Sequence, residues 1–438
     1  MLALVLVLAF ALPVSAEARG PSIVRDAEIE ALVADYARPL LKAAGLRPGA
    51  VRILIANDAR FNAFVSGRNM IVNTGLIMQA ATPNEVIGVI AHEIGHVKGG
   101  HQTRLAERVR QAKILASVGT LLGVGAGVAG GALGSRDAAS AGAAVGLSAP
   151  AFAMRNFLVY KRAEEATADR TAATLLRKTK QSGRGMIDTF ERFRRQLPTG
   201  GRIDPYKQSH PMPSARLSAM RDLLSRSPYY DRRDPRALQR RHDMARAKIA
   251  AYTDQRRARG VLTSRTLHPQ ARAYGSTILE HLYGSPKKAV PMIDRLIKQQ
   301  PKNAYLHEMK GEILLRAGRA KEAVRPLRRA IKLDRTGSGF LRVQLGHALL
   351  SSGGSKNLRA AVRELKRGTS GDRYGVAGYR YLALAHAGLG QEGEALLASA
   401  ELAYRSGRRG EARAFARRAR SQLKKGSPAW VRAGDILG

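Results

Sequence analysis

The chain has 438 residues, too many for one ordinary hydrophobic core, so its length indicates two or three domains. Its apolar share of 45% and charged share of 25% are typical of folded globular proteins and exclude a disordered chain. The formal net charge is +40, but the basic residues are spread along the chain without a nucleic-acid-binding motif, so we expect solvated helix faces and no nucleic-acid partner.

The first 16 residues have the pattern of an export signal. An apolar stretch from Leu2 to Val14 precedes the small residues Ser15 and Ala16 and the polar Glu17. The stretch is shorter than the ~20 apolar residues that span a bilayer, which disfavours a retained anchor and predicts cleavage after Ala16. The chain has no cysteine, which is compatible with a bacterial periplasm and excludes a thiolate metal site.

Three elements are predicted before residue 75. Residues 26–47 have the apolar spacing of a helix, and Val51–Ala56 and Arg68–Thr74 are rich in strand-forming residues. Residues 62–67 supply a turn or an edge segment between the two strands.

The clearest helix signals follow. Thr82 is a natural N-cap, Pro83 suits the first helical position, and Glu85 completes a Thr-x-x-Glu capping box. Gly99-Gly100 predicts the end of this helix.

This helix contains His92-Glu93-Ile94-Gly95-His96. Residues four apart share one helix face, so His92 and His96 can bind a single ion. Glu93 is turned about 100° from His92, so its carboxylate lies beside the ion and can accept a proton from an attacking water. The motif predicts one Zn2+ per chain, with Glu93 as the general base.

A catalytic zinc needs a third protein ligand, and Glu165 is the candidate. It lies in a second predicted helix, and Asp169 follows one turn later, where a carboxylate can hold the outer nitrogen of a histidine ligand. Glu164 is expected at the surface. The alternative interpretation of this segment is an ordinary solvated acidic turn.

Another class of zinc peptidase has a third histidine six residues after the second. Gln102 occupies that position here and His101 comes one residue early, so this class is disfavoured. We expect His101 to be a helix-end or packing histidine, since a cation is favourable near a helix C-terminus.

Residues 114–153 are rich in apolar and small side chains, in two stretches over 114–133 and 138–153. Seven glycines between residues 119 and 134 disfavour a buried helix. Three interpretations stay open: a mobile apolar hairpin over the active site, which we favour, a hairpin that touches or enters a membrane, and plain core.

His210 follows both predicted zinc helices, in Ser209-His210-Pro211. Three roles are open: an exposed loop histidine, a hydrogen-bond donor to the tetrahedral oxyanion, or a ligand that fills the open zinc position and keeps the enzyme latent. Arg216 can anchor this segment by pairing with Asp169 or another carboxylate.

From about residue 270 onward the sequence repeats. Gly-Arg-x-x-Glu-Ala at 318–323 recurs at 407–412, and Gly-Gln-x-x-Glu-Ala occupies 390–395. The spacing resembles the tetratricopeptide repeat of about 34 residues, whose small residues let paired helices stack closely. We expect three or four degenerate repeats and a capping helix.

Five segments together resemble the gluzincin metallopeptidases of the HtpX, Oma and BepA type, over residues 25–225. They are Asn62-Ala63-Phe64, Thr74-Gly75-Leu76, Ala91-His92-Glu93-Ile94-Gly95-His96-Val97, Arg162-x-x-Glu165-x-x-Ala168-Asp169, and His210-Pro211 followed by Arg216. With the export signal and the repeats, the whole chain is similar to the periplasmic group of β-barrel assembly-enhancing proteases, which acts in outer-membrane protein quality control.

The resemblance implies the ligand set His92, His96 and Glu165, with Glu93 catalytic. It also implies an edge strand near residues 62–67 that pairs with an extended substrate backbone. The remaining site assignments are a catalytic role for His210, supporting roles around the metal for Asp169, Arg162 and Arg216, and substrate binding by Asn62, Ala63, Phe64 and Val65.

The sequence therefore predicts an α+β zincin-like catalytic domain, mostly helical with a small sheet, followed by an all-α tetratricopeptide-repeat solenoid. The expected boundaries are 1–16 for the signal, 17–225 for the metallopeptidase domain, 226–269 for a helical linker and 270–438 for the repeats.

The expected function is zinc-dependent hydrolysis of misfolded or unassembled envelope proteins in the periplasm of a Gram-negative bacterium, with the repeats recruiting clients or partner proteins. Peripheral membrane contact through residues 114–153 is a further expectation. The alternative is a periplasmic chaperone or adaptor with weak or vestigial proteolysis, which the intact Glu93 disfavours.

Overall fold

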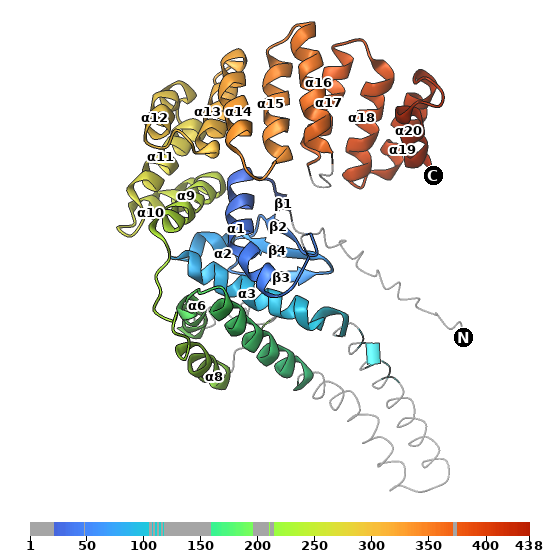
Figure 1. Cartoon of the computed structure of the whole chain (residues 1–438). Coiled ribbons are helices and arrows are strands. Elements are labelled where there is room, and N and C mark those ends of the chain that lie inside the picture. The colour runs from blue at the N-terminus through green and yellow to red at the C-terminus, as the bar shows by residue number, and fades with distance from the viewer. Residues whose placement is uncertain are drawn as a thin grey trace, which may run out of the picture.

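The computed structural model describes residues 22–47, 49–104, 159–195, 210, 214–370 and 375–438, with further helical positions at 107, 110, 111, 114 and 117. This part of the chain is mostly helical and contains one four-stranded sheet (Figure 1). The expected export signal and most of the expected hairpin at 114–153 lie outside the described residues. Within the described ranges, no helix combines the length and the apolar composition needed to cross a bilayer.

The sheet has the strand order β1-β2-β4-β3. Strands β2 and β4 are parallel, and the two outer pairings are antiparallel. The segment expected to be a turn or an edge is thus strand β3, at one edge of the sheet, and Gly67 with φ 58° closes its turn to β4. The strand bounds are Ile23–Val24 for β1, Arg52–Ala56 for β2, Ala63–Ser66 for β3 and Asn69–Asn73 for β4.

Two long helices cover one face of this sheet. Helix α1 (Ala27–Ala43) begins where the Asp26 side chain accepts a hydrogen bond from the Ile29 amide. Helix α3 (Pro83–Gly99) packs beside it, and the short α2 (Thr74–Gln79) links β4 to α3. The buried core between helices and sheet includes Leu32, Leu40, Ile55, Val72 and Ile90.

Helix α3 has the bounds that its capping signals predict. Thr82 Oγ1 accepts from the Glu85 amide, and Glu85 Oε1 accepts from the amide of Ala81, one residue before the cap, at 2.8 Å. The helix ends at Gly100, whose φ of 63° is the left-handed conformation that terminates helices. The chain turns there, so residues after Gly100 leave the axis of α3.

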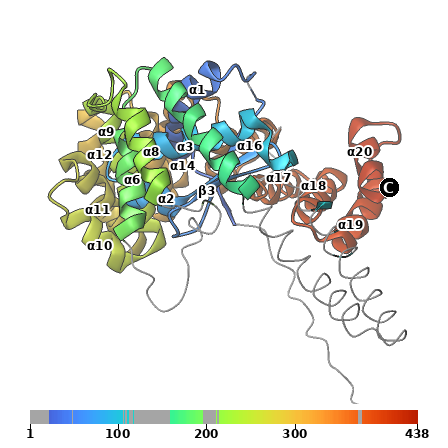
Figure 2. The ribbon, with the colours of Figure 1, turned by 90° about the horizontal axis from the view of Figure 1, so that it is seen from below.

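A second layer of helices lies against α3. A helix covers the described residues 159–178, and it is followed by α6 (Arg184–Arg195) and α8 (Ser214–Ser225). Helix α6 packs against both α3 and α8, and the three lie side by side in Figures 1 and 2. This layer brings Glu165, Asp169 and Arg216 to the HExxH helix.

The C-terminal half is a curved row of helices in which each packs against its neighbour in sequence (Figure 1). The helix bounds are Arg236–Thr253 for α9, Gln255–Thr263 for α10, Pro269–Tyr283 for α11, Pro286–Gln299 for α12, Ala304–Arg316 for α13, Ala320–Leu333 for α14, Gly339–Ser351 for α15, Ser355–Thr369 for α16, Ala377–Ala387 for α17, Glu392–Arg405 for α18, Arg409–Gln422 for α19 and Pro428–Leu437 for α20.

Glycines set the close packing in this row. A Cβ added to Gly311 or to Gly346 would lie 2.4 Å from Cγ of Leu327 or Leu365 on the following helix, so only glycine permits the approach. Gly318, which opens one of the repeated motifs, has φ 74° and lies between α13 and α14. These contacts form helix pairs, and their assignment as tetratricopeptide repeats stays a prediction.

Helix α9 joins the two halves of the molecule. Ala245 and Ile249 belong to the core of the first half, whereas Met244, Ala247 and Ala250 belong to the core formed with α11, α12 and α13. The region expected to be a linker therefore contributes a helix to two cores.

A buried charge cluster reinforces this junction. Lys248 Nζ on α9 lies 2.7 Å from Asp26, 3.3 Å from Glu28 and 3.5 Å from Glu308. Tyr274 on α11 donates a hydrogen bond of 2.9 Å to Glu28. The start of α1 is thereby tied to three helices of the C-terminal half.

Candidate active site

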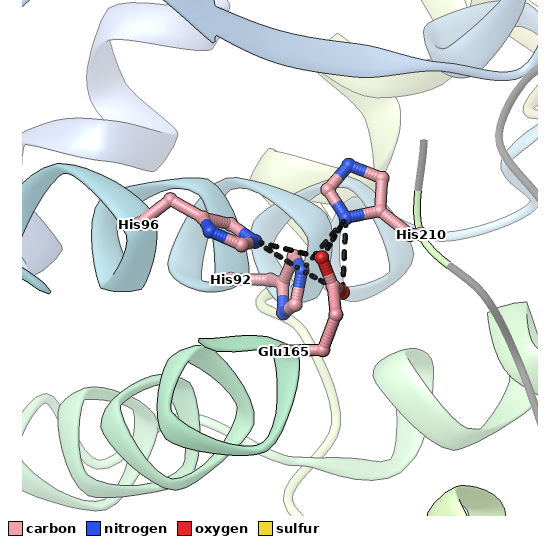
Figure 3. Close-up of side chains that lie close together, drawn as sticks. All are labelled: His92, His96, Glu165 and His210. Carbon is pink, nitrogen blue, oxygen red and sulfur yellow. Dashed lines mark hydrogen bonds and ion pairs between the residues drawn. The ribbon is translucent and has the colours of Figure 1, made fainter. Parts of the chain in front are cut away.

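Four side chains converge on one point between α3 and the second helix layer (Figure 3). Each of His92, His96, Glu165 and His210 offers a ligand atom, and these atoms all lie within 4.8 Å of one another. The HExxH helix supplies two of them, the helix over residues 159–178 supplies Glu165, and His210 comes from the segment before α8. Only His96 among the four is not fully buried.

The spacing of these atoms fits a tetrahedral ion. Ligands at about 2.0–2.1 Å from a tetrahedral zinc are separated by roughly 3.3 Å. Nε2 of His92 lies 3.0 Å from Nε2 of His96 and 3.2 Å from Nδ1 of His210. Glu165 Oε2 lies 3.3 Å from His92 Nε2 and 3.0 Å from His210 Nδ1. The donor set is therefore already arranged as the corners of a metal site.

The hydrogen bonding of His92 shows which of its nitrogens faces a metal. Its Nδ1 lies 2.9 Å from Asp169 Oδ1, so Nδ1 carries the proton and Nε2 presents a lone pair to the centre of the site. That lone pair faces Nε2 of His96 at 3.0 Å. Two lone pairs at this distance repel each other, and a cation bound by both nitrogens removes the repulsion. Burial opposes a charge on His92, but hydrogen bonds to Asp169 and Glu165 raise its pKa to about 9 in the metal-free chain, so a metal at Nε2 would displace a proton there.

Glu165 reaches the site because two helices approach closely. A Cβ on Gly95 would lie 2.7 Å from the carbonyl oxygen of Ala168, so the glycine inside the HExxH motif permits the contact. Burial alone would raise the pKa of Glu165, but hydrogen bonds from His210 and His92 hold it well below its usual range. Glu165 is therefore an anionic ligand candidate, not part of a solvated acidic turn.

Arg216 on α8 contacts two of these carboxylates. Its Nε lies 2.7 Å from Asp169 Oδ2, and its Nη1 lies 2.9 Å from Glu165 Oε2. Pairing with Asp169 or another carboxylate was predicted, and Arg216 contacts both Asp169 and Glu165.

Glu93 lies beside the ligand atoms without belonging to them. Its side chain is buried, and Oε1 lies 3.3 Å from His210 Nε2. Burial raises the pKa of Glu93 above its ordinary value. A carboxylate with a raised pKa beside a metal is suited to receive and return a proton.

His210 is not an exposed loop histidine, because only 5% of its surface is accessible. Its Nδ1 joins the ligand group and its Nε2 faces Glu93. Of the two functional roles left open by the sequence, this geometry favours ligation of the fourth position.

The edge strand β3 packs against α3 next to Glu93. The Asn62 carbonyl accepts from the Asn73 amide, and because peptide groups alternate along a strand, Ala63 and Val65 turn theirs toward the open edge. The Val65 amide hydrogen-bonds to the carboxylate of Glu93. The backbone of β3 is thus within reach of the group proposed as the general base.

A cavity of about 170 Å³ opens between β3 and the ligands, lined by Phe64, Val65, Glu93 and His210 among others. Phe64 is half-buried at its wall, whereas the Asn62 and Ala63 side chains are buried and present only backbone. The cavity is large enough to hold part of a substrate.

Arg162 and Gln102 lie near the site but outside the ligand group. Arg162 is exposed, and no hydrogen bond or ion pair links it to the site within the described residues, so its expected supporting role is not supported. It precedes Glu165 by almost one turn, beyond the part of the helix that packs on α3. Gln102, in the position of the alternative third histidine, instead accepts from the amide of Gly67 at 2.9 Å and ties the β3–β4 turn to the end of α3.

The fold and the site define a metallopeptidase of the HExxH class. Residues 24–224 match the model of Peptidase family M48, so this part of the chain is a Peptidase family M48 domain and the chain is a metalloprotease.

Relatives named as beta-barrel assembly-enhancing proteases match long stretches of the chain. The chain is 26% identical to the beta-barrel assembly-enhancing protease of Escherichia coli (strain K12) over 384 residues, which cover 85% of this chain and 75% of the relative. It is 25% identical to the protein of that name from Yersinia pestis over the same shares. A putative beta-barrel assembly-enhancing protease of Vibrio cholerae is 27% identical over 267 residues, which cover 57% of this chain and 51% of the relative.

Proposed function

We propose that this protein is a zinc-dependent endopeptidase that hydrolyses misfolded or unassembled envelope proteins in the periplasm of a Gram-negative bacterium. The observation that carries the proposal is the convergence of His92, His96 and Glu165 at tetrahedral spacing beside the buried Glu93. One zinc ion per chain is the metal that two imidazoles and a carboxylate from an HExxH framework suit best.

A zinc ion held there supplies Lewis-acid polarisation of a substrate carbonyl and of water. Glu93 accepts the proton of the attacking water and delivers it to the leaving amine, and its raised pKa suits both transfers. Asp169 keeps Nδ1 of His92 as a donor, so His92 stays in the tautomer that ligates. Direct attack by water requires no covalent intermediate.

Substrates are extended polypeptide segments. The open edge of β3 offers the peptide groups of Ala63 and the carbonyl of Val65, whose amide already contacts Glu93. Pairing of this kind recognises the backbone of a substrate rather than particular side chains. Segments that are not folded expose their peptide groups, which suits misfolded or unassembled proteins as clients. The helical row that follows the catalytic domain recruits clients or partner proteins, as a repeat solenoid with an extended surface does.

The relatives named for enhancing β-barrel assembly support the assignment to envelope proteins. An exported chain without cysteine fits a periplasmic location, and the apolar composition of residues 114–153 supports a peripheral membrane contact.

Metal analysis combined with a casein cleavage assay tests the proposal. Wild-type protein, Glu93→Gln and the control Glu392→Gln, which alters an exposed residue of α18, are all expected to hold one zinc. Cleavage by Glu93→Gln is expected to fall by about 10²–10⁴-fold, and the control is expected to match wild type. A wild-type protein that suppresses aggregation of unfolded clients without cleaving them would instead establish the chaperone or adaptor function.

A further inference from the structure

His101 folds back onto the metal site. Helix α3 ends at Gly100 in the left-handed conformation, and the turn brings the His101 ring beneath His96, where only 4% of its surface is accessible. Nδ1 of His101 lies 2.8 Å from Nδ1 of His96. The expectation of a helix-end or packing histidine is therefore incomplete, because the ring makes a polar contact with a ligand candidate.

The other nitrogen of His101 meets a carboxylate. Its Nε2 lies 2.7 Å from Oε2 of Glu164, and the same oxygen lies 3.2 Å from Nη2 of Arg104. Glu164 was expected at the surface, but its side chain is 16% exposed and is held between these two partners. It extends from the helix over residues 159–178, next to Glu165.

The protons in this chain of contacts have one consistent arrangement. If Nε2 of His96 binds a metal, its Nδ1 carries the proton and must donate it. The only acceptor at that position within the described residues is Nδ1 of His101. The proton of His101 is then on Nε2, which faces the carboxylate of Glu164.

The arrangement parallels that of the other ligand. Nδ1 of His92 ends directly on Asp169, which Arg216 holds in place. His96 reaches its carboxylate through an intervening imidazole. Both histidines of the HExxH helix are therefore linked to a carboxylate that an arginine contacts, His92 directly and His96 through His101.

We propose that His101 and Glu164 are positioning residues that fix the tautomer and ring orientation of His96 and so raise the affinity of the site for its metal. This proposal deepens the proposed function and rests on it. Neither residue belongs to the group of ligand candidates, although both line the cavity beside β3. Their effect passes through His96, as outer partners of metal-binding histidines act in general.

A substitution at Gly99 tests the contact between His101 and His96 without changing either residue. A Cβ on Gly99 would lie 2.0 Å from Nε2 of His101, so an alanine there forces the ring out of its place. Alanine is otherwise the more favourable residue within a helix. Gly99→Ala thus displaces His101 while leaving both members of the pair in the chain.

The test measures zinc affinity of the full-length protein by competition with a chromogenic chelator. His101→Phe, Glu164→Ala and Gly99→Ala are each expected to weaken zinc binding by about 10–100-fold. Glu164→Gln is expected to lose less, because an amide oxygen in that place can still face Nε2 of His101. Glu392→Ala, on an exposed position of α18, is the matched control and is expected to bind as wild type does.

Two further readouts separate positioning from packing. The visible spectrum of the cobalt-substituted protein is expected to change in His101→Phe, because the orientation of His96 changes. The melting temperature of the metal-free protein is expected to stay near that of wild type. Zinc affinities within twofold of wild type in all three variants, or a fall in metal-free stability with unchanged affinity, would overturn the proposal. Failure of the wild-type protein to bind zinc would instead reject the proposed function.

Discussion

Arg216 forms a two-point contact with Asp169, with Nε 2.7 Å from Oδ2 and Nη2 2.9 Å from Oδ1. A planar guanidinium makes such a contact and a lysine ammonium does not. Arg216→Lys is therefore expected to keep the charge, lose the alignment of Asp169 against His92, and weaken zinc binding by about 10–100-fold. Arg221→Lys, on an exposed face of α8, is the control, and equal zinc affinity in the two variants would contradict the argument.

Glu165→Ala removes a ligand candidate rather than an outer partner. Loss of a residue that only holds a ligand in place weakens metal binding by up to about 100-fold. We expect Glu165→Ala to lower zinc affinity by more than this and to lose activity in parallel. Glu164→Ala is expected to remain within that range and to recover activity when zinc is in excess. Titration of activity against zinc distinguishes the two variants, and the reverse order would reassign the ligand to Glu164.

His210 fills the fourth corner of the ligand group, 3.2 Å from Nε2 of His92. If it ligates and keeps the enzyme latent, His210→Ala opens a position for water and is expected to raise basal cleavage of a short fluorogenic peptide while zinc is retained. A donor to the oxyanion behaves in the opposite way, since its loss lowers kcat by about 10²–10³-fold. Initial rates on one peptide therefore decide between the two roles.

Glu308 makes stability depend on pH. Burial raises its pKa to about 8 from the ordinary value of 4.5, so the folded chain retains a proton that the unfolded chain has released between those values. Stability is therefore expected to fall as pH rises through this window. Glu308→Gln is expected to flatten the dependence in urea unfolding at pH 5 and pH 8. An unchanged slope would show that Glu308 ionises normally.

A chain that ends at residue 263 keeps α9, and with it Ala245 and Ile249 in the first core. We expect it to fold, bind zinc and cleave short peptides, but to lose its preference for natural clients and to unfold at lower urea. The second face of α9 is then exposed to water. A chain that ends at residue 234 lacks α9 and is expected to misfold. Equal stability of these two chains would show that α9 contributes little to the catalytic domain.

Local signals in the sequence predicted much of the catalytic framework. The capping box at Thr82 and Glu85 and the glycines at 99 and 100 place the ends of α3 correctly, because these residues act within one turn of the helix. The spacing of His92 and His96 places both on one face by helix geometry alone. The small sheet and the predominance of helix were also predicted.

Contacts between distant segments were beyond the reach of such signals. His101 meets Glu164 only because a left-handed glycine turns the chain back and a helix some 60 residues later passes nearby. The burial of Lys248 depends on three acidic residues, which are Asp26 before α1, Glu28 on α1 and Glu308 on α13. Strand β1 has two residues, too few for any periodic pattern. Arg162 shows the converse: its motif position suggested a contact with the site, and among the described residues no hydrogen bond or ion pair links it there.

Helix α9 contributes side chains to two hydrophobic cores, and this restricts which sequence changes the protein can tolerate. A chimaera that exchanges the helical row for another must carry α9 with the peptidase domain and must also recreate the surface that receives Met244, Ala247 and Ala250. The incoming row also has to accommodate the buried Lys248, which keeps Asp26 and Glu28 as partners but loses Glu308. Recombination between such proteins is thus restricted to arrays whose first helices already match, and the two halves are expected to have been inherited together.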